Sequence, residues 1–414
     1  MKIVLAHYKF YVQGGPERYM FKFIDLANKH GCEVIPFSIK YPMNNPTKYD
    51  KYFVESYADK AEFDAKSMSP LKALKKITSE FHNKEAYIKL KKLIHKEKPD
   101  LLYCLIPGGL SGDIFRAAKE EGIPIILRIS DFRLICGCNI LLRNKMICEK
   151  CIYGDNTALL KYKCVKKSTI LSFIRKCSLD YTRKKGYYHL VDAVITPPKH
   201  TASVLAKSRF FPRNKLYINH TFIDCSERIC NTIKDYVLCL GRFSPEKGFI
   251  YVVYALRYLR DIPIKIAVTG DYENCDPQLK KVIDKYNLID KVEFVGFLQG
   301  EELERITAEA LCVAAPAIWY ENLPNVVLEA YSYGRPVIAS NIGSLAEMVD
   351  DGKTGLLFEP KNSKQIADCI RKLYENKDYC NKLGANALIK CKTDFSPELH
   401  WKCFVEIYKK VRRG

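Results

Sequence analysis

Short apolar runs recur along the chain, and most of them lead through a turn sequence into an amphipathic helical pattern. The first run is 3–6, and others lie at 101–106 and 123–129. A second series of the same kind begins at 236–240. Unbroken apolar runs are typical of strands buried on both faces, and their alternation with helices indicates parallel sheets. The pattern therefore predicts an α/β protein with two Rossmann-like domains.

The length of 414 residues suits two domains, each large enough for its own core. Residues 226–235 carry few large apolar groups and mixed charges, which is typical of a linker. The sequence thus divides into a first domain at 1–225 with a Cys-rich insertion at 136–164, the linker at 226–235, a second domain at 236–395, and a final helix at 396–414.

Positive charge is concentrated in the first half of the chain. The net charge is +20, and residues 1–200 hold 36 Lys and Arg against 20 Asp and Glu. A single Lys-rich helix is predicted over about 71–97. A basic half suggests an anionic partner such as membrane headgroups or a lipid-linked pyrophosphate, although solvated lysines are an equal alternative. No helix-turn-helix, RNA-recognition or DNA-reading zinc-finger pattern is present, so no nucleic-acid partner is expected.

Membrane insertion is not expected from the sequence. No apolar run reaches the 18 or more residues of a transmembrane helix, and the apolar start at 1–6 is too short for the core of a signal peptide. We therefore expect a cytoplasmic protein, with peripheral contact to the inner face of the membrane through the basic first domain as an open alternative.

The most informative stretch is 319–340, in which Glu321 and Glu329 flank the pair Pro324 and Asn325. Proline is favoured at a helix start, so a short helix is predicted from Asn325. The free N–H groups at such a start form an anion site. Carboxylates on both sides of it suit a phosphate-containing ligand with hydroxyl groups at both ends, such as a nucleotide-sugar. A solvated surface loop is the alternative interpretation.

Two other turns carry groups suited to phosphate. Gly14 and Gly15 lie between the first strand and its helix, where backbone N–H groups can approach a phosphate closely. Arg242 and Lys247 flank the first turn of the second series. A guanidinium there can bind a diphosphate through two hydrogen bonds, and the ammonium adds a point charge.

The stretch 319–340 resembles the donor-site signature of glycosyltransferase family 4, in which two glutamates are separated by seven residues before a Gly-Arg-Pro sequence. The resemblance implies the GT-B arrangement, two Rossmann-like domains facing a cleft. It also implies that Glu321 contacts the transferred sugar and Glu329 the ribose. The remaining donor-binding residues that the resemblance implies in this stretch are Asn322, Leu323, Pro324, Asn325 and Val326.

The same resemblance extends to the other turns. It implies that Gly14 and Gly15 lie against the donor diphosphate, that Arg242 and Lys247 neutralise the leaving diphosphate, and that the turn at Gly296 holds the nucleotide base. The family's last helix is expected to cross back to the first domain.

The implied reaction is transfer of a hexose-type sugar, with retention of configuration, from a nucleotide-diphosphate-sugar to a hydroxyl of a glycan or lipid-linked acceptor. Cell-surface polysaccharide or lipopolysaccharide synthesis is the expected context. No Asp-X-Asp metal motif is evident, so no cofactor is expected for catalysis. A sugar-nucleotide-binding protein without catalysis and a nucleotide-sugar epimerase are the alternatives.

One position departs from the family pattern. The strand at 123–129 ends in Ser130 and Asp131, where the family often has a His-Asp pair. Serine is no base at neutral pH, which leaves Asp131 as the candidate to position or polarise the acceptor hydroxyl. His7, after the first strand, is expected at the same sheet edge.

Four cysteines of the insertion have the spacing of a metal site. Cys148 and Cys151 have a two-residue spacer, and Cys136 and Cys164 complete a set of four thiolates suited to tetrahedral zinc. A subset of the resembled family carries such a Cys-rich insertion. A structural zinc ion is one interpretation, and free thiols or an iron–sulfur cluster are the others.

Overall fold

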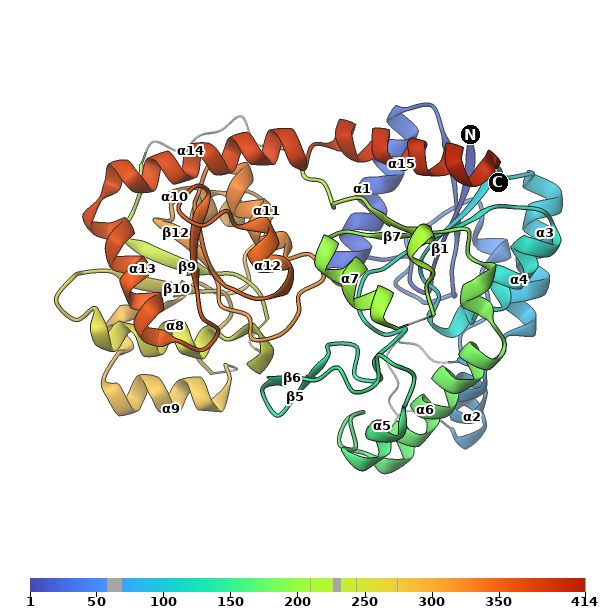
Figure 1. The fold of residues 1–414 in the computed structure, drawn as a ribbon, viewed down its shortest axis with the longest axis horizontal. Helices are drawn as coiled ribbons and strands as arrows, with labels where there is room; N and C mark the ends of the chain where they lie inside the picture. The colour runs from blue at the N-terminus through green and yellow to red at the C-terminus, as the bar shows by residue number, and fades with distance from the viewer. Residues whose placement is uncertain (58–68, 209, 226–231, 243, 274, 414) are drawn as a thin grey trace.

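The computed structural model describes residues 1–57, 69–208, 210–225, 232–242, 244–273 and 275–413. It consists of two α/β domains side by side, each built on a parallel sheet (Figure 1). Part of the predicted linker, 226–231, lies outside the described residues. The predicted fold class is confirmed.

The first sheet has strand order β2-β1-β3-β4-β7-β8, and all of its pairs are parallel. β1 and β3 are almost wholly apolar and buried because helices cover both faces of the sheet. The strands are β1 (Lys2–His7), β2 (Glu33–Phe37), β3 (Leu101–Ile106), β4 (Ile125–Arg128), β7 (Ala193–Thr196) and β8 (Leu216–Ile218).

The second sheet is also parallel and has the strand order β11-β10-β9-β12-β13-β14. Chain order reverses on either side of β9, which is where open α/β sheets place their ligands. The strands are β9 (Tyr236–Cys239), β10 (Lys265–Val268), β11 (Val292–Phe294), β12 (Cys312–Ala315), β13 (Val337–Ser340) and β14 (Gly355–Phe358).

Helices cover both sheets. Those of the first domain are α1 (Gly15–Lys29), α2 (Pro70–Ser79), α3 (Lys84–Glu97), α4 (Asp113–Glu120), α5 (Thr157–Lys161), α6 (Thr169–Lys184) and α7 (Lys199–Lys207). Those that follow are α8 (Phe249–Ala255), α9 (Pro277–Tyr286), α10 (Gly300–Glu309), α11 (Asn325–Ser332), α12 (Gly343–Met348), α13 (Ser363–Glu375), α14 (Lys377–Asp394) and α15 (Pro397–Arg413).

Short 3₁₀ turns link several of these elements. They are η1 (Asp50–Tyr52), η2 (Gly108–Leu110), η3 (Tyr187–Leu190), η4 (Arg213–Lys215), η5 (Pro245–Lys247), η6 (Leu256–Tyr258) and η7 (Ile289–Lys291).

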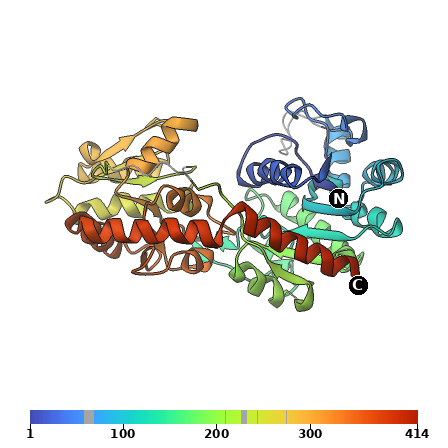
Figure 2. The ribbon, with the colours of Figure 1, turned by 90° about the horizontal axis from the view of Figure 1, so that it is seen from above.

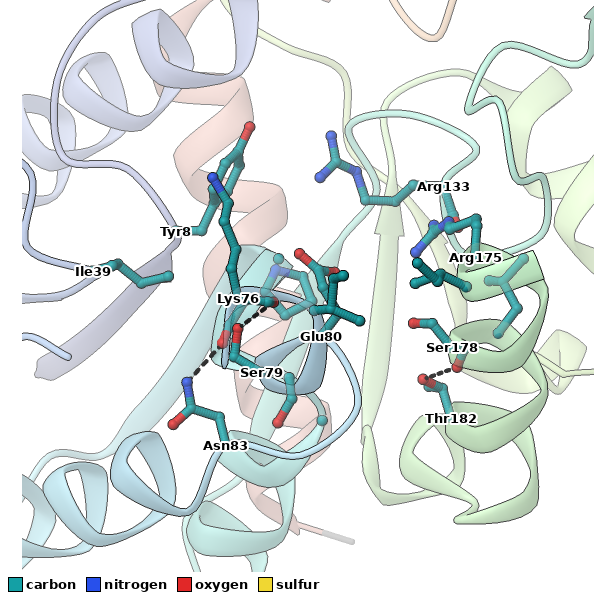
Figure 3. Close-up of a pocket in the computed structure, with 18 of the residues that line it drawn as sticks. Tyr8, Ile39, Lys76, Ser79, Glu80, Asn83, Arg133, Arg175, Ser178 and Thr182 are labelled. Atoms are coloured by element: carbon teal, nitrogen blue, oxygen red, sulfur yellow. Dashed lines mark hydrogen bonds between the residues drawn. The ribbon is translucent and has the colours of Figure 1, made fainter. Parts of the chain in front are cut away.

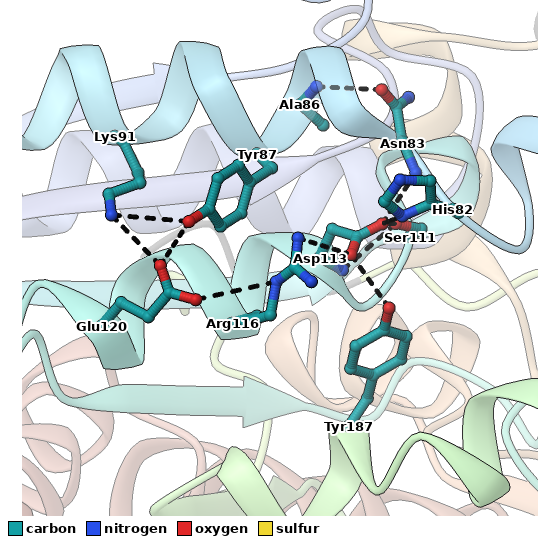
Figure 4. A network of polar contacts seen from close by, with 10 residues as sticks. All are labelled: His82, Asn83, Ala86, Tyr87, Lys91, Ser111, Asp113, Arg116, Glu120 and Tyr187. Carbon is teal, nitrogen blue, oxygen red and sulfur yellow. Dashed lines mark hydrogen bonds and ion pairs between the residues drawn. The ribbon is translucent and has the colours of Figure 1, made fainter.

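The prediction of a single helix over about 71–97 is wrong, because the structure has two helices there, α2 and α3, with a non-helical segment between them. Asn83 caps α3, and its side-chain oxygen accepts from the N–H of Ala86 at 2.9 Å. The backbone N–H of Asn83 and the imidazole Nδ1 of His82 both lie 2.7 Å from the Asp113 carboxylate (Figure 4). An asparagine side chain competes with helical hydrogen bonding, which favours a cap over a helix interior.

Asp113 is fully buried and ties several segments together. Its carboxylate also accepts from the hydroxyls of Ser111 at 2.8 Å and Tyr187 at 2.9 Å (Figure 4). Burial raises the pKa of Asp113, but hydrogen bonds from the N–H of Asn83, from Ser111 and from Tyr187 outweigh burial and lower it below its ordinary value. The carboxylate is therefore ionised at neutral pH, and it holds η2, the start of α3 and η3 together.

The last helix, α15, packs on the first domain although it follows the second. Figures 1 and 2 show α14 running along the second domain and α15 along the first. The side chains of Trp401 and Phe404 are buried in a cluster with Phe23 of α1 and Tyr103 of β3. The final helix thus links the two domains covalently and by packing.

The Cys-rich insertion also reaches the second domain. Its antiparallel hairpin, β5 (Leu142–Arg143) and β6 (Met146–Ile147), presents Lys145 at the turn. The Lys145 ammonium lies 3.1 Å from the side-chain oxygen of Gln278 in α9.

Across the described residues, no helix is both long enough and apolar enough to cross a bilayer.

We expect Phe404→Ala to lower the stability of the first domain by about 3–5 kcal/mol, because it empties a fully buried aromatic site. Urea unfolding followed by circular dichroism would measure the loss. Ile389→Ala, at an exposed position of α14, is the matched control and should stay within about 0.5 kcal/mol of the parent. Equal losses in both variants would contradict docking of α15 on the first domain.

Candidate active site

The centre of the site is the N-terminal end of α11. Pro324 precedes the helix in an extended conformation, and the first helical residue is Asn325. Proline is favoured at a helix start because the N–H group that it lacks would have no helical partner there. Val327 and Leu328 are buried and anchor the helix in the core of the second domain, into which Leu323 and Val326 also pack. The free N–H groups of the first turn are therefore held rigidly, as an anion site requires.

Glu321 lies just before this helix and is held on three sides. Its Oε1 is 2.6 Å from the Lys247 ammonium and accepts from the Trp319 indole N–H at 3.0 Å. The backbone carbonyl of Glu321 accepts from the Ser344 hydroxyl at 2.7 Å. The side chain is only 10% exposed, so its carboxylate has a defined position beside the anion site.

The predicted cations come from the turn after β9. Lys247 ends η5, and Gly248 follows with φ of 73°. A Cβ on Gly248 would lie 2.0 Å from the Pro316 carbonyl oxygen, so only glycine allows this turn to pack against the chain before Glu321. Arg242 lies in the same turn with its side chain exposed, where it can move to a ligand.

The diglycine loop of the first domain faces α11 directly. A Cβ on Gly15 would lie 3.1 Å from the side-chain nitrogen of Asn325, so glycine permits the close approach of the two loops. The N–H of Gly14 donates to Glu17 at 2.8 Å, and Glu17 is buried. The structure therefore brings together two segments that the sequence separates by about 300 residues.

Glu329 lies one turn into α11 and also faces the first domain. Its carboxylate is 3.9 Å from a guanidinium nitrogen of Arg18 in α1. Burial raises the pKa of Glu329, and Arg18 opposes this only in part. In the free protein, Arg18 offsets only part of the cost of burying the Glu329 carboxylate. Such a carboxylate is suited to accept hydrogen bonds from hydroxyl groups of a ligand.

Asn322 joins the two domains. Its side-chain nitrogen donates to the Ile129 carbonyl oxygen at 2.8 Å, and its side-chain oxygen accepts from the Thr201 hydroxyl at 2.9 Å. Glu347 makes a second bridge, since its carboxylate accepts from the N–H groups of Lys199 and His200, both at 2.9 Å. These bonds show that Asn322 contributes to the domain interface. Its role in donor binding stays a prediction.

The residues predicted for the acceptor side lie at the carboxyl ends of β1 and β4. The Asp131 carboxylate makes a bidentate pair with Arg133, with nitrogen–oxygen distances of 2.7–3.0 Å. The Ser130 hydroxyl is buried, and no partner for it is found among the described residues. Asp131 is thus held by Arg133, and its action on an acceptor hydroxyl stays a prediction.

His7 is buried at the end of β1, as expected for that sheet edge. Its Nδ1 lies 2.8 Å from the Lys9 carbonyl oxygen, and its Nε2 is 3.7 Å from Glu17. Burial lowers the pKa of His7 to about 3, so the imidazole is neutral at pH 7.

Gly296 lies at the open edge of the second sheet. It has φ of 71° and exchanges two backbone hydrogen bonds with Gly270, at 2.7 and 3.0 Å. The next residue, Phe297, is 80% exposed. An aromatic ring so exposed beside the predicted base-binding turn is a surface on which a base could stack.

The cysteines of the insertion separate into a pair and a loose cluster. The sulfur of Cys136 is 3.4 Å from that of Cys138, whereas Cys151 and Cys164 lie around Leu159. Burial raises the pKa of Cys151 to about 12, with smaller contributions from the nearby thiols of Cys164, Cys148 and Cys138. Within the described ranges, no group of three or more His, Cys, Asp or Glu side chains is arranged to hold a metal ion.

Several site residues were not predicted. Trp319 and Ser344 fix Glu321, and Thr201 and Glu347 join the domains. Of these residues, Trp319 could have been predicted from the sequence. It lies inside the stretch 319–340, and an indole N–H can donate to a carboxylate two residues away. The others contact the site only through tertiary structure.

Comparison with known proteins agrees with this geometry. Residues 229–389, which include most of the second domain, match the family model described as Glycosyl transferases group 1. Alpha-D-kanosaminyltransferase from Streptomyces kanamyceticus is 30% identical over 155 residues, 36% of this chain and 39% of that protein. An uncharacterized 41.2 kDa protein in the cps region of Klebsiella pneumoniae is 25% identical over 60% of this chain and 71% of its own length.

Solved structures match the whole chain. Sucrose-phosphate synthase from Thermosynechococcus elongatus superimposes with a TM-score of 0.69 at 17% identity and covers 99% of this chain and 98% of its own. Anabaena Alr3699/HepE in complex with UDP gives a TM-score of 0.67 at 16% identity, over 99% and 100% of the two chains. The fold is that of the GT-B glycosyltransferases.

We expect Glu329→Gln to raise thermal stability at pH 7. The raised pKa of Glu329 means that the folded state favours the protonated carboxyl, so its contribution is fully favourable below the ordinary Glu pKa and is lost as pH rises through the folded-state pKa. Melting temperatures from pH 4 to 8 should show a gain for the glutamine variant that grows with pH and then levels off. A gain that is equal at all pH values would contradict burial as its cause.

Proposed function

We propose that this protein is a glycosyltransferase that moves a hexose-type sugar from a nucleotide-diphosphate-sugar to a hydroxyl of a glycan or lipid-linked acceptor, with retention of configuration. The observation that carries the proposal is the contact between the diglycine loop and the start of α11. Gly15 lies so close to Asn325 that a Cβ on the glycine would be 3.1 Å from the Asn325 side-chain nitrogen. Around that point lie Glu321, Glu329 and Lys247, the groups that a diphosphate and two sugars need.

The charges around this point suit a leaving diphosphate. The N-terminal end of α11, the Lys247 ammonium and the exposed guanidinium of Arg242 would stabilise the negative charge that develops as the glycosidic bond breaks. These groups supply that stabilisation without a metal ion. Before the donor binds, Lys247 is neutralised by Glu321 at 2.6 Å, so the pair also keeps the lysine in place in the free protein.

Retention of configuration fits the state of the two described groups at the proposed acceptor side that could act as a base. Asp131 is paired with Arg133, and burial lowers the pKa of His7 to about 3, which makes its imidazole a weak base. A leaving phosphate oxygen on the same face as the incoming hydroxyl could take its proton. Matches to a protein of a cps region, and to the fold of a lipopolysaccharide outer core galactosyltransferase, support a role in cell-surface glycan synthesis.

The first test is donor binding and turnover. Nucleotide-sugars with different bases should raise the melting temperature to different degrees, and the one with the largest shift is the donor. With that donor, Lys247→Ala and Glu321→Gln should each lower kcat for nucleoside diphosphate release by about 100–1,000-fold, because each removes a group placed at the developing charge.

The control for both variants is Glu302→Gln, at an exposed position of α10. It removes the same charge at an exposed position outside the predicted site residues and should keep full turnover. Product anomers, followed by NMR, would show retention, and turnover in EDTA would test independence from metal. Full turnover in both Lys247→Ala and Glu321→Gln would contradict the assignment of the site.

We also propose a structural zinc ion in the insertion, held by Cys148, Cys151 and Cys164 with a fourth thiolate from Cys136. Burial, and after it the nearby thiols of Cys164, Cys148 and Cys138, raise the pKa of Cys151, and this proximity supports the set. Zinc would have to draw these thiols into a tetrahedral arrangement that the described residues do not have without it. Cys136 lies against Cys138, so either could supply the fourth sulfur. Bound zinc would stabilise a segment with little core of its own.

We expect about one zinc per chain by elemental analysis of purified protein, as in four-thiolate structural sites. Cys148→Ser should lose the metal and lower the melting temperature of the first domain. Cys369→Ser, in the second domain, is the control and should keep it. Zinc and iron both well below one per chain would contradict the proposal.

A further inference from the structure

A well-formed cavity lies in the first domain, and all the residues that line it belong to that domain. It has a volume of about 430 Å³, within the range of small-molecule sites. Its walls come from α2 and η2 on one side and α6 on the other (Figure 3). The two walls also meet through an edge-to-face contact between Phe81 and Tyr181, with ring centroids 5.9 Å apart.

One end of this cavity is the sheet edge at which the acceptor must lie. It is lined by Tyr8 and Pro107, which directly follow β1 and β3, and by Arg133 in the loop after β4. Arg133 is the partner of Asp131, and Tyr8 is adjacent to His7. The cavity therefore extends from the proposed acceptor position into the first domain.

Cations dominate the charged groups of this cavity. Figure 3 shows Arg133 and Arg175 together on the α6 side, where Arg175 donates to the Arg133 carbonyl oxygen. A guanidinium has five N–H donors, so that one bond leaves others for an anion. The charged residues that line the cavity are four cations and two carboxylates, namely Lys76, Arg133, Lys166, Arg175, Glu55 and Glu80.

The deeper wall is apolar and continues to the surface. Ile77 of α2 and Ile174 of α6 line the cavity. One turn before them, Leu74 and Ile170 lie on the same helix faces and are 57% and 72% exposed. Leu71 and Phe173 extend the exposed apolar surface, at 64% and 55%.

Water-facing leucine, isoleucine and phenylalanine side chains on both helices are unfavourable unless a ligand or surface covers them. The helices that carry them are basic. α2 has three lysines and no acidic residue, and α6 has four basic residues and one acidic residue. Charge and apolar surface together select an amphiphile with a negative head.

We propose that this cavity binds the acceptor, and that the acceptor is lipid-linked. Its phosphate lies at Arg133 and Arg175, its aliphatic chain lies between α2 and α6, and a longer chain continues over Leu74 and Ile170. The hydroxyl to be glycosylated then points from the phosphate towards Asp131 and the donor site. This inference rests on the proposed function and names its acceptor class.

The buried network of Asp113 keeps the cavity open. Asn83 and Ser111 line it, and both bind the Asp113 carboxylate, which also holds Tyr187 (Figure 4). Since these groups satisfy one another, the floor is preorganised, and a ligand need not order it.

The test uses octyl phosphate as the probe, with inorganic phosphate and octyl glucoside as probes that keep only the head charge or only the tail. Isothermal titration of the full chain should show octyl phosphate binding at least about tenfold more tightly than either, because only it uses both halves of the cavity. Equal affinity of inorganic phosphate would show an anion site only, and equal affinity of octyl glucoside an apolar cavity only. Either result overturns the proposal.

Two variants locate the site. Ile174→Trp should fill the cavity and abolish octyl phosphate binding, and Arg175→Gln should weaken it by about tenfold through loss of a charged donor. Ile389→Trp, at an exposed position of α14, is the matched control and should bind as the parent does. Unchanged affinity in both cavity variants, with the fold intact by circular dichroism, overturns the proposal.

The donor-binding melting shift separates this proposal from the proposed function. Ile174→Trp should keep the shift produced by the nucleotide-sugar, since the cavity lies away from α11. Loss of octyl phosphate binding with a retained donor shift supports an acceptor site. If no nucleotide-sugar shifts the parent protein while octyl phosphate binds, the glycosyltransferase assignment fails and the cavity is a lipid-phosphate site of another kind. That result would overturn its role as an acceptor site.

Discussion

The close approach of the diglycine loop to the start of α11 is the contact on which the site depends. Free N–H groups at a helix start attract an anion only if they are held in place and reachable. Burial of Val327 and Leu328 holds the helix, and the absence of a Cβ at Gly15 brings the opposite loop to Asn325. A larger side chain at Gly15 would separate the two halves of the proposed diphosphate site.

The two domains are held in this relation by bonds that use the site's own residues. Asn322 reaches the carbonyl at the end of β4, and Glu347 caps α7 of the other domain. Because Asn322 is adjacent to Glu321, a change in the domain contact moves the carboxylate beside the proposed sugar. Domain position and donor geometry are therefore coupled through neighbouring residues.

The proposed acceptor side has a different physical basis. There, polar groups satisfy one another, as the buried Asp113 does with four donors and the half-buried Asp131 does with Arg133. An ionised carboxylate in the interior is stable only with such partners. The result is a preformed cavity with basic groups at one end and apolar groups at the other, beside the proposed donor site.

The sequence by itself determined the alternating strands and helices, the helix start at Asn325, and the glycines and cations of the donor turns. These are local properties, set by hydrophobic period, by proline and glycine geometry, and by residues close together in the chain. The prediction of one helix over about 71–97 failed because the break at His82 and Asn83 is held by hydrogen bonds to Asp113, thirty residues away. Tertiary structure alone decided the pairing of Glu321 with Lys247, the roles of Thr201 and Glu347, and the cavity between α2 and α6, since each joins segments that only folding brings together.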